Sequence, residues 1–180
     1  MKKSWALVAA VALSLALAGP ASANKPTDPS KATKAIASLR AEAPVIRSVD
    51  PSVTQAAQGT RTMQALLAES CREGTWRVTA HNIFGWRIFS YVRWVRWCWS
   101  GSLLTSVSTR AWGEVFLPGW SFRGTIGSWT SGGPGRTSYR VWSQGHFCLV
   151  EYFSCIANSY PWIDVTVYPG GGWRWSWGGA

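Results

Sequence analysis

The chain has 180 residues, of which 47% are hydrophobic and 14% charged, and its 18 bases against 8 acids give a net charge of +10 at pH 7. A basic surface of this kind favours anionic partners. Beyond the N-terminal leader no apolar run approaches the roughly 20 residues that cross a bilayer, which argues against a transmembrane anchor.

The N-terminus has the three parts of a secretory signal peptide. Two lysines precede an apolar stretch, Trp5–Ala18, and the small triplet Ala-Ser-Ala follows at positions 21–23. The apolar stretch is shorter than the roughly 20 residues that span a membrane, and it ends at an A-x-A cleavage site. We therefore expect residues 1–23 to be a signal peptide that is cleaved near Ala23, so that the mature protein is secreted and extracellular.

Residues 24–70 have the composition of a linker or pro-segment. The segment contains four prolines and no aromatic residue, and Ala, Ser, Thr and Lys dominate it. Such a stretch buries too little apolar surface to offset the entropy lost on ordering. We expect it to be largely disordered, with a short helix either from the cap Asp50 and Pro51 at its first position, or from Thr60 to Glu69.

The composition changes at Cys71. Thirteen of the 14 tryptophans, all 6 phenylalanines and all 5 tyrosines lie between this residue and the C-terminus. All ten basic residues of this region are arginines, whose guanidinium groups stack on aromatic rings and grip planar anions. Residues 71–180 are therefore predicted to form one Trp/Arg-rich domain.

This region shows the period-2 alternation of β-strands, with Gly, Pro and Ser between the runs. The predicted strands begin near Thr75 and continue as Trp86–Trp99, a hairpin loop at 100–102, Leu103–Trp112, Trp120–Thr130, Thr137–Leu149, Trp162–Tyr168 and Trp173–Trp177. The pattern predicts an all-β fold, an antiparallel β-sandwich or small barrel of six to seven strands that is stapled by disulfides. A flexible or weakly helical N-terminal segment precedes it.

Four cysteines in an exported chain are expected to form two disulfides. If the first hairpin folds about the midpoint of Phe84 and Gly85, facing positions sum to 169, and Cys71 lies opposite Cys98. Cys148 then pairs with Cys155 by elimination. A zinc site is the alternative, but the spacing lacks a Cys-x-x-Cys and the compartment favours oxidation, so no metal and no cofactor is predicted.

Aromatic residues are too numerous for the core alone: residues 71–180 hold 24 aromatic residues against 18 Ile, Leu and Val. Both faces of the long strand carry rings and arginines, which predicts a partly exposed ladder. The C-terminal tryptophans share one face of an extended segment and either cap the core or form a stacking platform; we expect at least one of them to cap. The candidate ligand-binding residues are Arg93, Trp94, Arg96, Trp97, Trp173, Arg174, Trp175 and Trp177.

Outside a cell, exposed indoles and arginines suit a cell-wall polysaccharide or another anionic envelope surface. We therefore expect a secreted, non-catalytic binding protein that recognises cell-envelope glycan or such a surface. A membrane-active or bacteriocin-like toxin is one alternative, and a small secreted hydrolase such as a glycosidase is another. Export, together with the lack of an RRM, KH or zinc-finger signature, disfavours nucleic acid.

Catalytic machinery is sparse in the sequence. The domain lacks a Gly-x-Ser-x-Gly elbow, a His-Glu-x-x-His motif and a phosphate-binding glycine loop. No catalytic residue is therefore assigned. The titratable groups that a hydrolase could use are Glu73, Glu114, Glu151, Asp164, His81 and His146.

Several short strings resemble small exported Trp-rich proteins of high-GC Gram-positive bacteria. These are Trp112–Thr130 with its Pro-Gly-Trp-Ser-Phe at 118–122, Gln144–Phe147, and Tyr-Pro-Trp-Ile-Asp at 160–164. The resemblance spans residues 71–180 and implies export, β-structure and disulfides. It implies no reaction, because that group has no assigned activity.

Overall fold

A computed structural model of the chain describes residues 34–50 and 69–179. Two antiparallel sheets pack face to face as a β-sandwich, which confirms the predicted fold class. The expected signal peptide lies outside the described residues, and so does nearly all of the segment in which a short helix was predicted.

The described residues form ten strands, where six to seven were expected. In chain order these are β1 Ser38–Ala41, β2 Val45–Val49, β3 Ser70–His81, β4 Arg87–Ser100, β5 Leu103–Val115, β6 Trp120–Gly132, β7 Tyr139–Glu151, β8 Ser154–Ser159, β9 Trp162–Val167 and β10 Trp173–Gly178, with a 3-10 turn, η2, at Pro169–Gly171.

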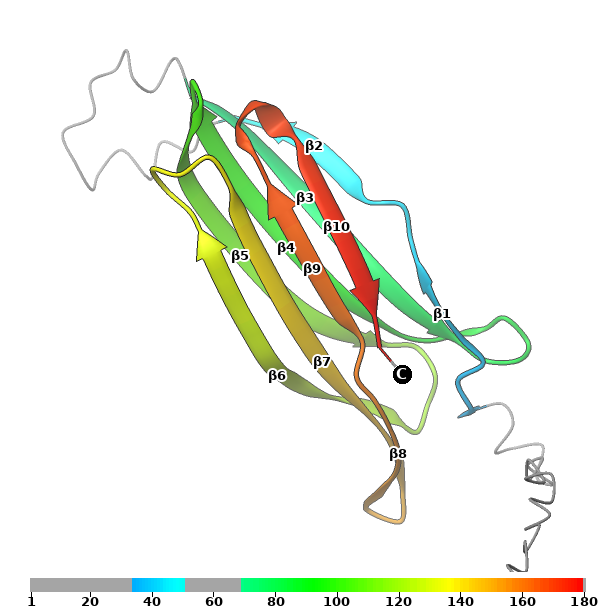
Figure 1. The fold of residues 1–180 in the computed structure, drawn as a ribbon. Coiled ribbons are helices and arrows are strands. Elements are labelled where there is room, and N and C mark those ends of the chain that lie inside the picture. Colours follow the sequence, from blue (N-terminus) through cyan, green and yellow to red (C-terminus); the bar gives the residue numbers. More distant parts are fainter. Residues whose placement is uncertain (1–33, 51–68, 180) are drawn as a thin grey trace, which may run out of the picture.

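Each sheet is a run of antiparallel neighbours. Sheet A has the order β1-β3-β4-β5, with β2 also on β3, and sheet B has the order β10-β9-β7-β6, with β8 also on β7. The chain completes β3, β4 and β5 before the β5–β6 connection carries it across to sheet B, at the lower end of Figure 1. Consecutive hairpins therefore build each layer separately.

The β3–β4 hairpin has the predicted register. Facing positions sum to 169 from Cys71 opposite Cys98 to Ala80 opposite Phe89, and a bulge shifts the pairing at His81. Both predicted disulfides are present, Cys71–Cys98 between β3 and β4 and Cys148–Cys155 between β7 and β8. All four cysteines are therefore bridged.

The N-terminal boundary at Cys71 is too late. Strands β1 and β2 lie in the segment expected to be a linker, yet both pair with the outer edge of β3. Pro44, which has no N–H to donate, lies in the gap between them. Sheet B repeats the arrangement, because β8 and β9 pair with successive parts of β7 and Pro161 separates them.

Aromatic rings dominate the interior between the sheets. Phe89 of sheet A stacks on Phe147 of sheet B with centroids 3.9 Å apart, and Trp76 and Trp97 lie side by side with no exposed surface. Close approach of the layers needs glycine at Gly113 and Gly145: a Cβ there would lie 2.4 Å from the ring of Phe122 and 2.6 Å from the ring of Tyr91, respectively. The core thus uses large flat side chains at the contact between the layers.

Candidate functional site

Strand β4 places half of its predicted binding residues inside the protein. Trp97 has no exposed surface and Arg93 is 4% exposed, so the expected exposed ladder is wrong for both. They share the inward face with Phe89 and Tyr91. Trp94 and Arg96 lie on the opposite, outward face of sheet A and are partly exposed, as expected.

Arg93 is a buried cation, and no salt bridge with a carboxylate is found for it among the described residues. One of its Nη atoms donates to Thr109 Oγ1 at 2.9 Å, and its Nε has no partner among the described residues. Burial lowers the pKa of the guanidinium, because removal from water disfavours the charged form. A surface role for this residue is therefore excluded by its position.

The C-terminal tryptophans of β10 face the interior. Trp173 makes an edge contact with buried Trp76 at 6.0 Å between centroids, and Trp175 packs against the core. Trp177 shares their face and, like Trp173, remains 38% exposed. The capping prediction is confirmed, whereas Arg174 alternates to the outer face of sheet B.

The outer face of sheet A is occupied by ion pairs. Arg77 of β3 donates through both Nη atoms to the carboxylate of Glu114 on β5, which also accepts from the indole nitrogen of Trp112 at 3.0 Å. These hydrogen bonds, that from Arg77 first, lower the pKa of Glu114. Glu42 joins the group through Arg77, at 3.6 Å. Arg77, Glu114 and Glu42 are thus engaged with one another on this face.

The outer face of sheet B presents indoles in a different way. Trp129 of β6 pairs with Trp142 of β7, and Trp162 of β9 lies one strand beyond, beside Gln144. Trp129 is 43% exposed and the other two are partly exposed. We call these three residues the indole face.

Glycines allow two of these rings to lie across a neighbouring strand. A Cβ at Gly127 of β6 would meet the six-membered ring of Trp142 at 3.1 Å, and a Cβ at Gly178 of β10 would meet the Trp162 ring at 2.8 Å. Each ring therefore occupies the space where a side chain would stand on the adjacent strand. Both rings thus lie close to the backbone of the neighbouring strand.

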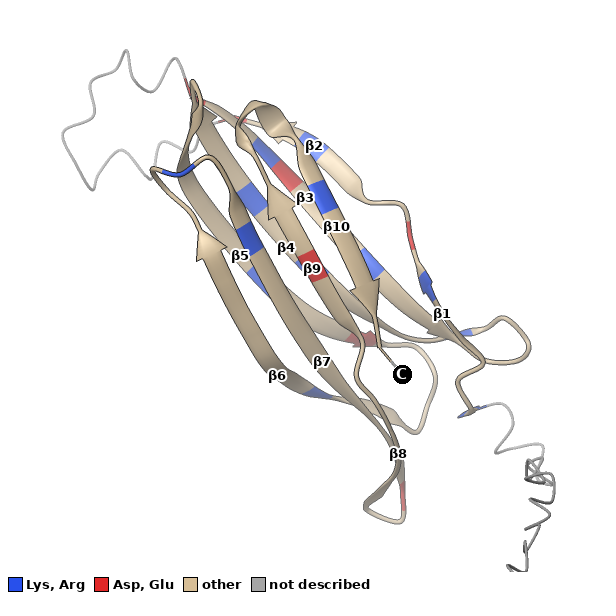
Figure 2. Cartoon of the chain, in the orientation of Figure 1, with Lys and Arg blue, Asp and Glu red and all other residues tan. Residues whose placement is uncertain are grey.

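Charged groups border the indole face. Arg140 of β7 bonds the carboxylate of Asp164 on β9 through Nε and Nη2, and its guanidinium lies 4.9 Å from the centre of the Trp129 ring. Asp164 raises the pKa of Arg140 by accepting these bonds. Figure 2 shows the acidic position on β9 between basic positions on β7 and β10, the latter being Arg174.

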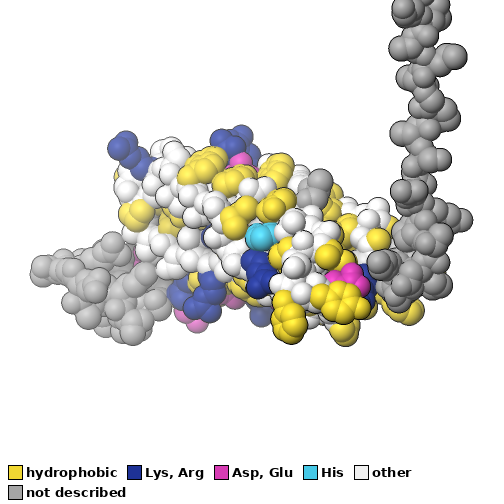
Figure 3. Space-filling view, turned by 90° about the horizontal axis from the view of Figure 1, so that it is seen from below, with side chains coloured by type: hydrophobic (Ala, Val, Ile, Leu, Met, Phe, Trp, Pro, Cys, Tyr) yellow, Lys and Arg dark blue, Asp and Glu magenta, His cyan; other side chains and the backbone are white. Residues whose placement is uncertain are grey.

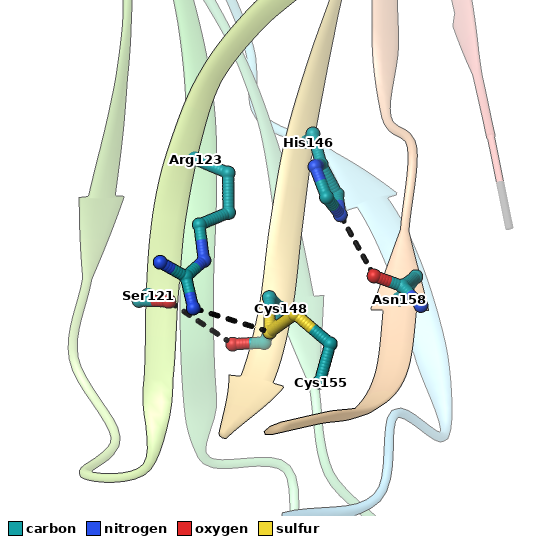
Figure 4. Close-up of a disulfide and its surroundings, with 6 residues drawn as sticks. All are labelled: Ser121, Arg123, His146, Cys148, Cys155 and Asn158. Carbon is teal, nitrogen blue, oxygen red and sulfur yellow. Dashed lines mark hydrogen bonds between the residues drawn. A yellow bond between two sulfur atoms is a disulfide. The ribbon is translucent and has the colours of Figure 1, made fainter. Parts of the chain in front are cut away.

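The same face continues to the second disulfide. Figure 4 shows Arg123 directed at Cys148, whose sulfur lies 3.9 Å from a guanidinium nitrogen, and His146 directed at Asn158, 2.7 Å away. The His146 ring also stacks on Tyr160, with centroids 5.0 Å apart. These contacts hold β6, β7 and β8 together beside the indole face.

The titratable groups named from the sequence do not converge. Glu114 lies on the outer face of sheet A and Asp164 on the outer face of sheet B, each bound to an arginine. Glu151 ends β7, and His146 contacts an amide and a tyrosine ring. Glu114 and Asp164 therefore cannot flank one scissile bond as a glycosidase pair.

Sequence reasoning missed the indole face because its register could not be read in advance. Strand β6 carries two irregularities, at 122–124 and at 125–127, and each changes which residues point outward. The alternation of Arg140, Trp142 and Gln144 was the available signal. The two glycines beside the rings could be recognised only once the strands were paired.

Comparison with protein-family models, curated proteins and solved structures gives no match to this chain. Within the described residues, no helix is long and apolar enough to cross a membrane.

Proposed function

We propose that this chain is an exported, non-catalytic protein that binds cell-envelope glycan through the indole face of sheet B. The observation that carries the proposal is the pair of indoles, Trp142 and Trp162, laid over Gly127 and Gly178. The C–H face of a sugar ring is flat and apolar, so it matches an indole presented face-on.

The spacing of the rings suits an extended chain of sugars. Neighbouring strands lie about 5 Å apart, and residues on one face of a strand repeat about every 7 Å. Trp129 and Trp142 face each other on adjacent strands, whereas Trp162 lies one strand over and two residues along. The three rings therefore define a diagonal path across the sheet.

The bordering charges favour a glycan that carries acidic groups. Arg174 lies next to Arg140 across one strand, and Thr166 is between them in the register. Asp164 neutralises part of this charge. An arginine beside stacked sugars offers paired N–H donors to a carboxylate or phosphate.

Export is the remaining part of the proposal. Residues 1–23 are inferred to direct secretion, and two disulfides are typical of proteins in oxidising compartments. An envelope glycan is the abundant sugar polymer that such a protein meets first.

Retention on insoluble cell-wall glycan tests the proposal. Purified peptidoglycan is compared with and without its anionic wall polymers, and the bound fraction is measured for the wild type and for Trp129→Ala/Trp142→Ala. We expect the affinity of the double variant to be at least about tenfold lower, because it lacks two rings that would stack on the sugars. If the arginines contact acidic groups, the wild type should bind more weakly to peptidoglycan without its anionic polymers than to peptidoglycan that retains them.

The matched control is Trp94→Ala/Trp112→Ala on the outer face of sheet A. Both rings are partly exposed, as is Trp142, so this pair removes comparable surface from the wrong face. Equal loss in both double variants, or no retention of the wild type on either glycan, would overturn the proposal.

A further inference from the structure

The β7–β8 turn exposes two aromatic residues in a costly backbone conformation. Tyr152 is 89% and Phe153 100% exposed, and their φ angles are 48° and 69°. Positive φ at both central residues is the geometry that Asn-Gly adopts readily in a two-residue hairpin. Bulky side chains there are strained, and such strain tends to mark functional sites.

The hairpin that carries this tip is firmly held. Cys148–Cys155 bridges its strands a few residues from the turn, and the pairing continues to Glu151 opposite Ser154. The two rings therefore project from a fixed stem. Their position is a property of the fold and does not depend on a loose loop.

Two other loops bring exposed apolar side chains to the same end of the sandwich. The β3–β4 turn and the β5–β6 connection both lie there, since Phe116 N bonds to Ile88 O and Val150 N bonds to Gly119 O. We call this set of exposed residues the aromatic end: Ile83, Phe84, Trp86, Val115, Phe116, Tyr152 and Phe153. Figure 3, which views the molecule from below, shows hydrophobic side chains standing out among polar atoms and basic groups.

Cations accompany these tips. The guanidinium of Arg87 lies 4.2 Å from the centre of the Phe116 ring, although it also approaches Glu42 at 3.7 Å. Arg123 and Lys34 flank the β5–β6 connection, the latter near Gly119. Glu151 supplies an acid beside the β7–β8 turn, and residues 71–180 as a whole hold ten bases against four acids.

We propose that the aromatic end docks onto an anionic phospholipid bilayer. Its apolar groups stand on separate tips, and each can enter a fluid interface without a matching pocket, whereas a folded partner would have to offer a pocket for each. Aromatic side chains with a polar edge favour the headgroup region, and nearby arginines attract anionic lipid. The surface is separate from the indole face, so the two proposals stand or fall independently.

Vesicle sedimentation tests this docking with a variant that should keep the hairpin. Tyr152→Asn/Phe153→Gly replaces the rings with the residues that suit the backbone. Binding is measured on phosphatidylcholine vesicles with and without about one quarter phosphatidylglycerol. We expect the wild type to bind the anionic vesicles, more weakly at higher salt, and the variant to bind at least about tenfold less while melting at the same or a higher temperature.

Leu103→Ser is the control, because this residue is 44% exposed at the opposite end. It should leave vesicle binding unchanged. The proposal fails if the wild type does not bind anionic vesicles, or if Tyr152→Asn/Phe153→Gly binds them as well as the wild type does. If the wild type does not bind vesicles but forms concentration-dependent dimers that Tyr152→Asn/Phe153→Gly abolishes, the tip contacts a second copy of the chain instead.

Discussion

The outer faces of the two sheets both carry tryptophan and arginine, but the two residue types are arranged differently on each. On sheet A, Trp112 donates its indole N–H to Glu114, which is already bonded to Arg77. On sheet B, Trp142 lies over Gly127, and Arg140 sits above the Trp129 ring. Composition alone therefore does not distinguish the two faces: what differs is whether the neighbouring strand places a side chain or a glycine beside the indole.

The difference has a simple physical origin. A side chain on an adjacent strand normally occupies the space about 5 Å away, so a ring has to stand up beside it. Thr75 and Arg110 flank Trp94 in this way on sheet A. On sheet B, Gly178 leaves the position opposite Trp162 without a side chain, and Gly127, diagonal to Trp142, leaves room for that ring. We infer that sheet A's outer face contributes stability and sheet B's contributes binding.

The largest effect should follow from opening the disulfide on sheet A. Cys71 and Cys98 are 27 residues apart, against 7 for Cys148 and Cys155. Loop-closure entropy predicts that Cys71→Ala/Cys98→Ala lowers the free energy of unfolding by about 3.6 kcal/mol and the other double variant by about 2.4 kcal/mol. Urea unfolding of both proteins measures the difference, and glycan retention per folded molecule should stay unchanged in the first. If Cys148→Ala/Cys155→Ala proved the less stable of the two variants, the inference that sheet A contributes more of the stability would be contradicted.

Much of the fold could be predicted from the sequence because its strands are long and regular. The register of β3 and β4 follows from one turn position, and that register brings Cys71 opposite Cys98. The edge strands β1 and β2 could not be predicted in this way. They are only 4 and 5 residues long and owe their form to pairing with a distant strand.

The candidate site was harder to predict than the fold. Period-2 alternation correctly separated the two faces of β4, but it could not say which face is covered by the other sheet, and so Arg93 and Trp97 were expected outside. A guanidinium on the core face contradicts the ordinary preference of charged groups for water. The indole face depends on which residues lie opposite one another across β6 and β7, and that is non-local information.

An intermediate effect should follow from Glu114→Gln, which keeps the shape of the side chain and removes its charge. Loss of the bond with Arg77 should lower the free energy of unfolding by about 1 kcal/mol at pH 7, since both side chains are partly exposed.

The pH dependence gives the same prediction a sharper form. The pKa of Glu114 is lowered in the folded protein, so its stabilisation is fully present above the pKa of the unfolded carboxyl, about 4.3, and is lost as the pH falls through the folded value. Melting temperatures between pH 7 and pH 2.5 should therefore fall less in Glu114→Gln than in the wild type. Parallel curves would show that this face contributes no charge-dependent stability.

The smallest effect should come from Gly127→Ala. This variant tests whether glycan binding depends on how closely the Trp142 ring lies on the neighbouring strand. The added methyl would lie 3.1 Å from the Trp142 ring, so the ring has to tilt away from the sheet by a few tenths of an ångström. A tilt of this size costs about 0.5 kcal/mol, the low end for a side chain moved off its rotamer, and the lower entropy of the unfolded chain offsets this cost. Stability should therefore change by less than about 0.5 kcal/mol, whereas glycan affinity should fall about threefold, because a tilted ring no longer meets a sugar face-on. Ser131→Ala, on the same strand and opposite Arg140, should leave both unchanged. If Gly127→Ala retains full glycan affinity, the orientation of the Trp142 ring does not explain why sheet B would bind glycan and sheet A would not. The bordering arginines would then be the residues to substitute next.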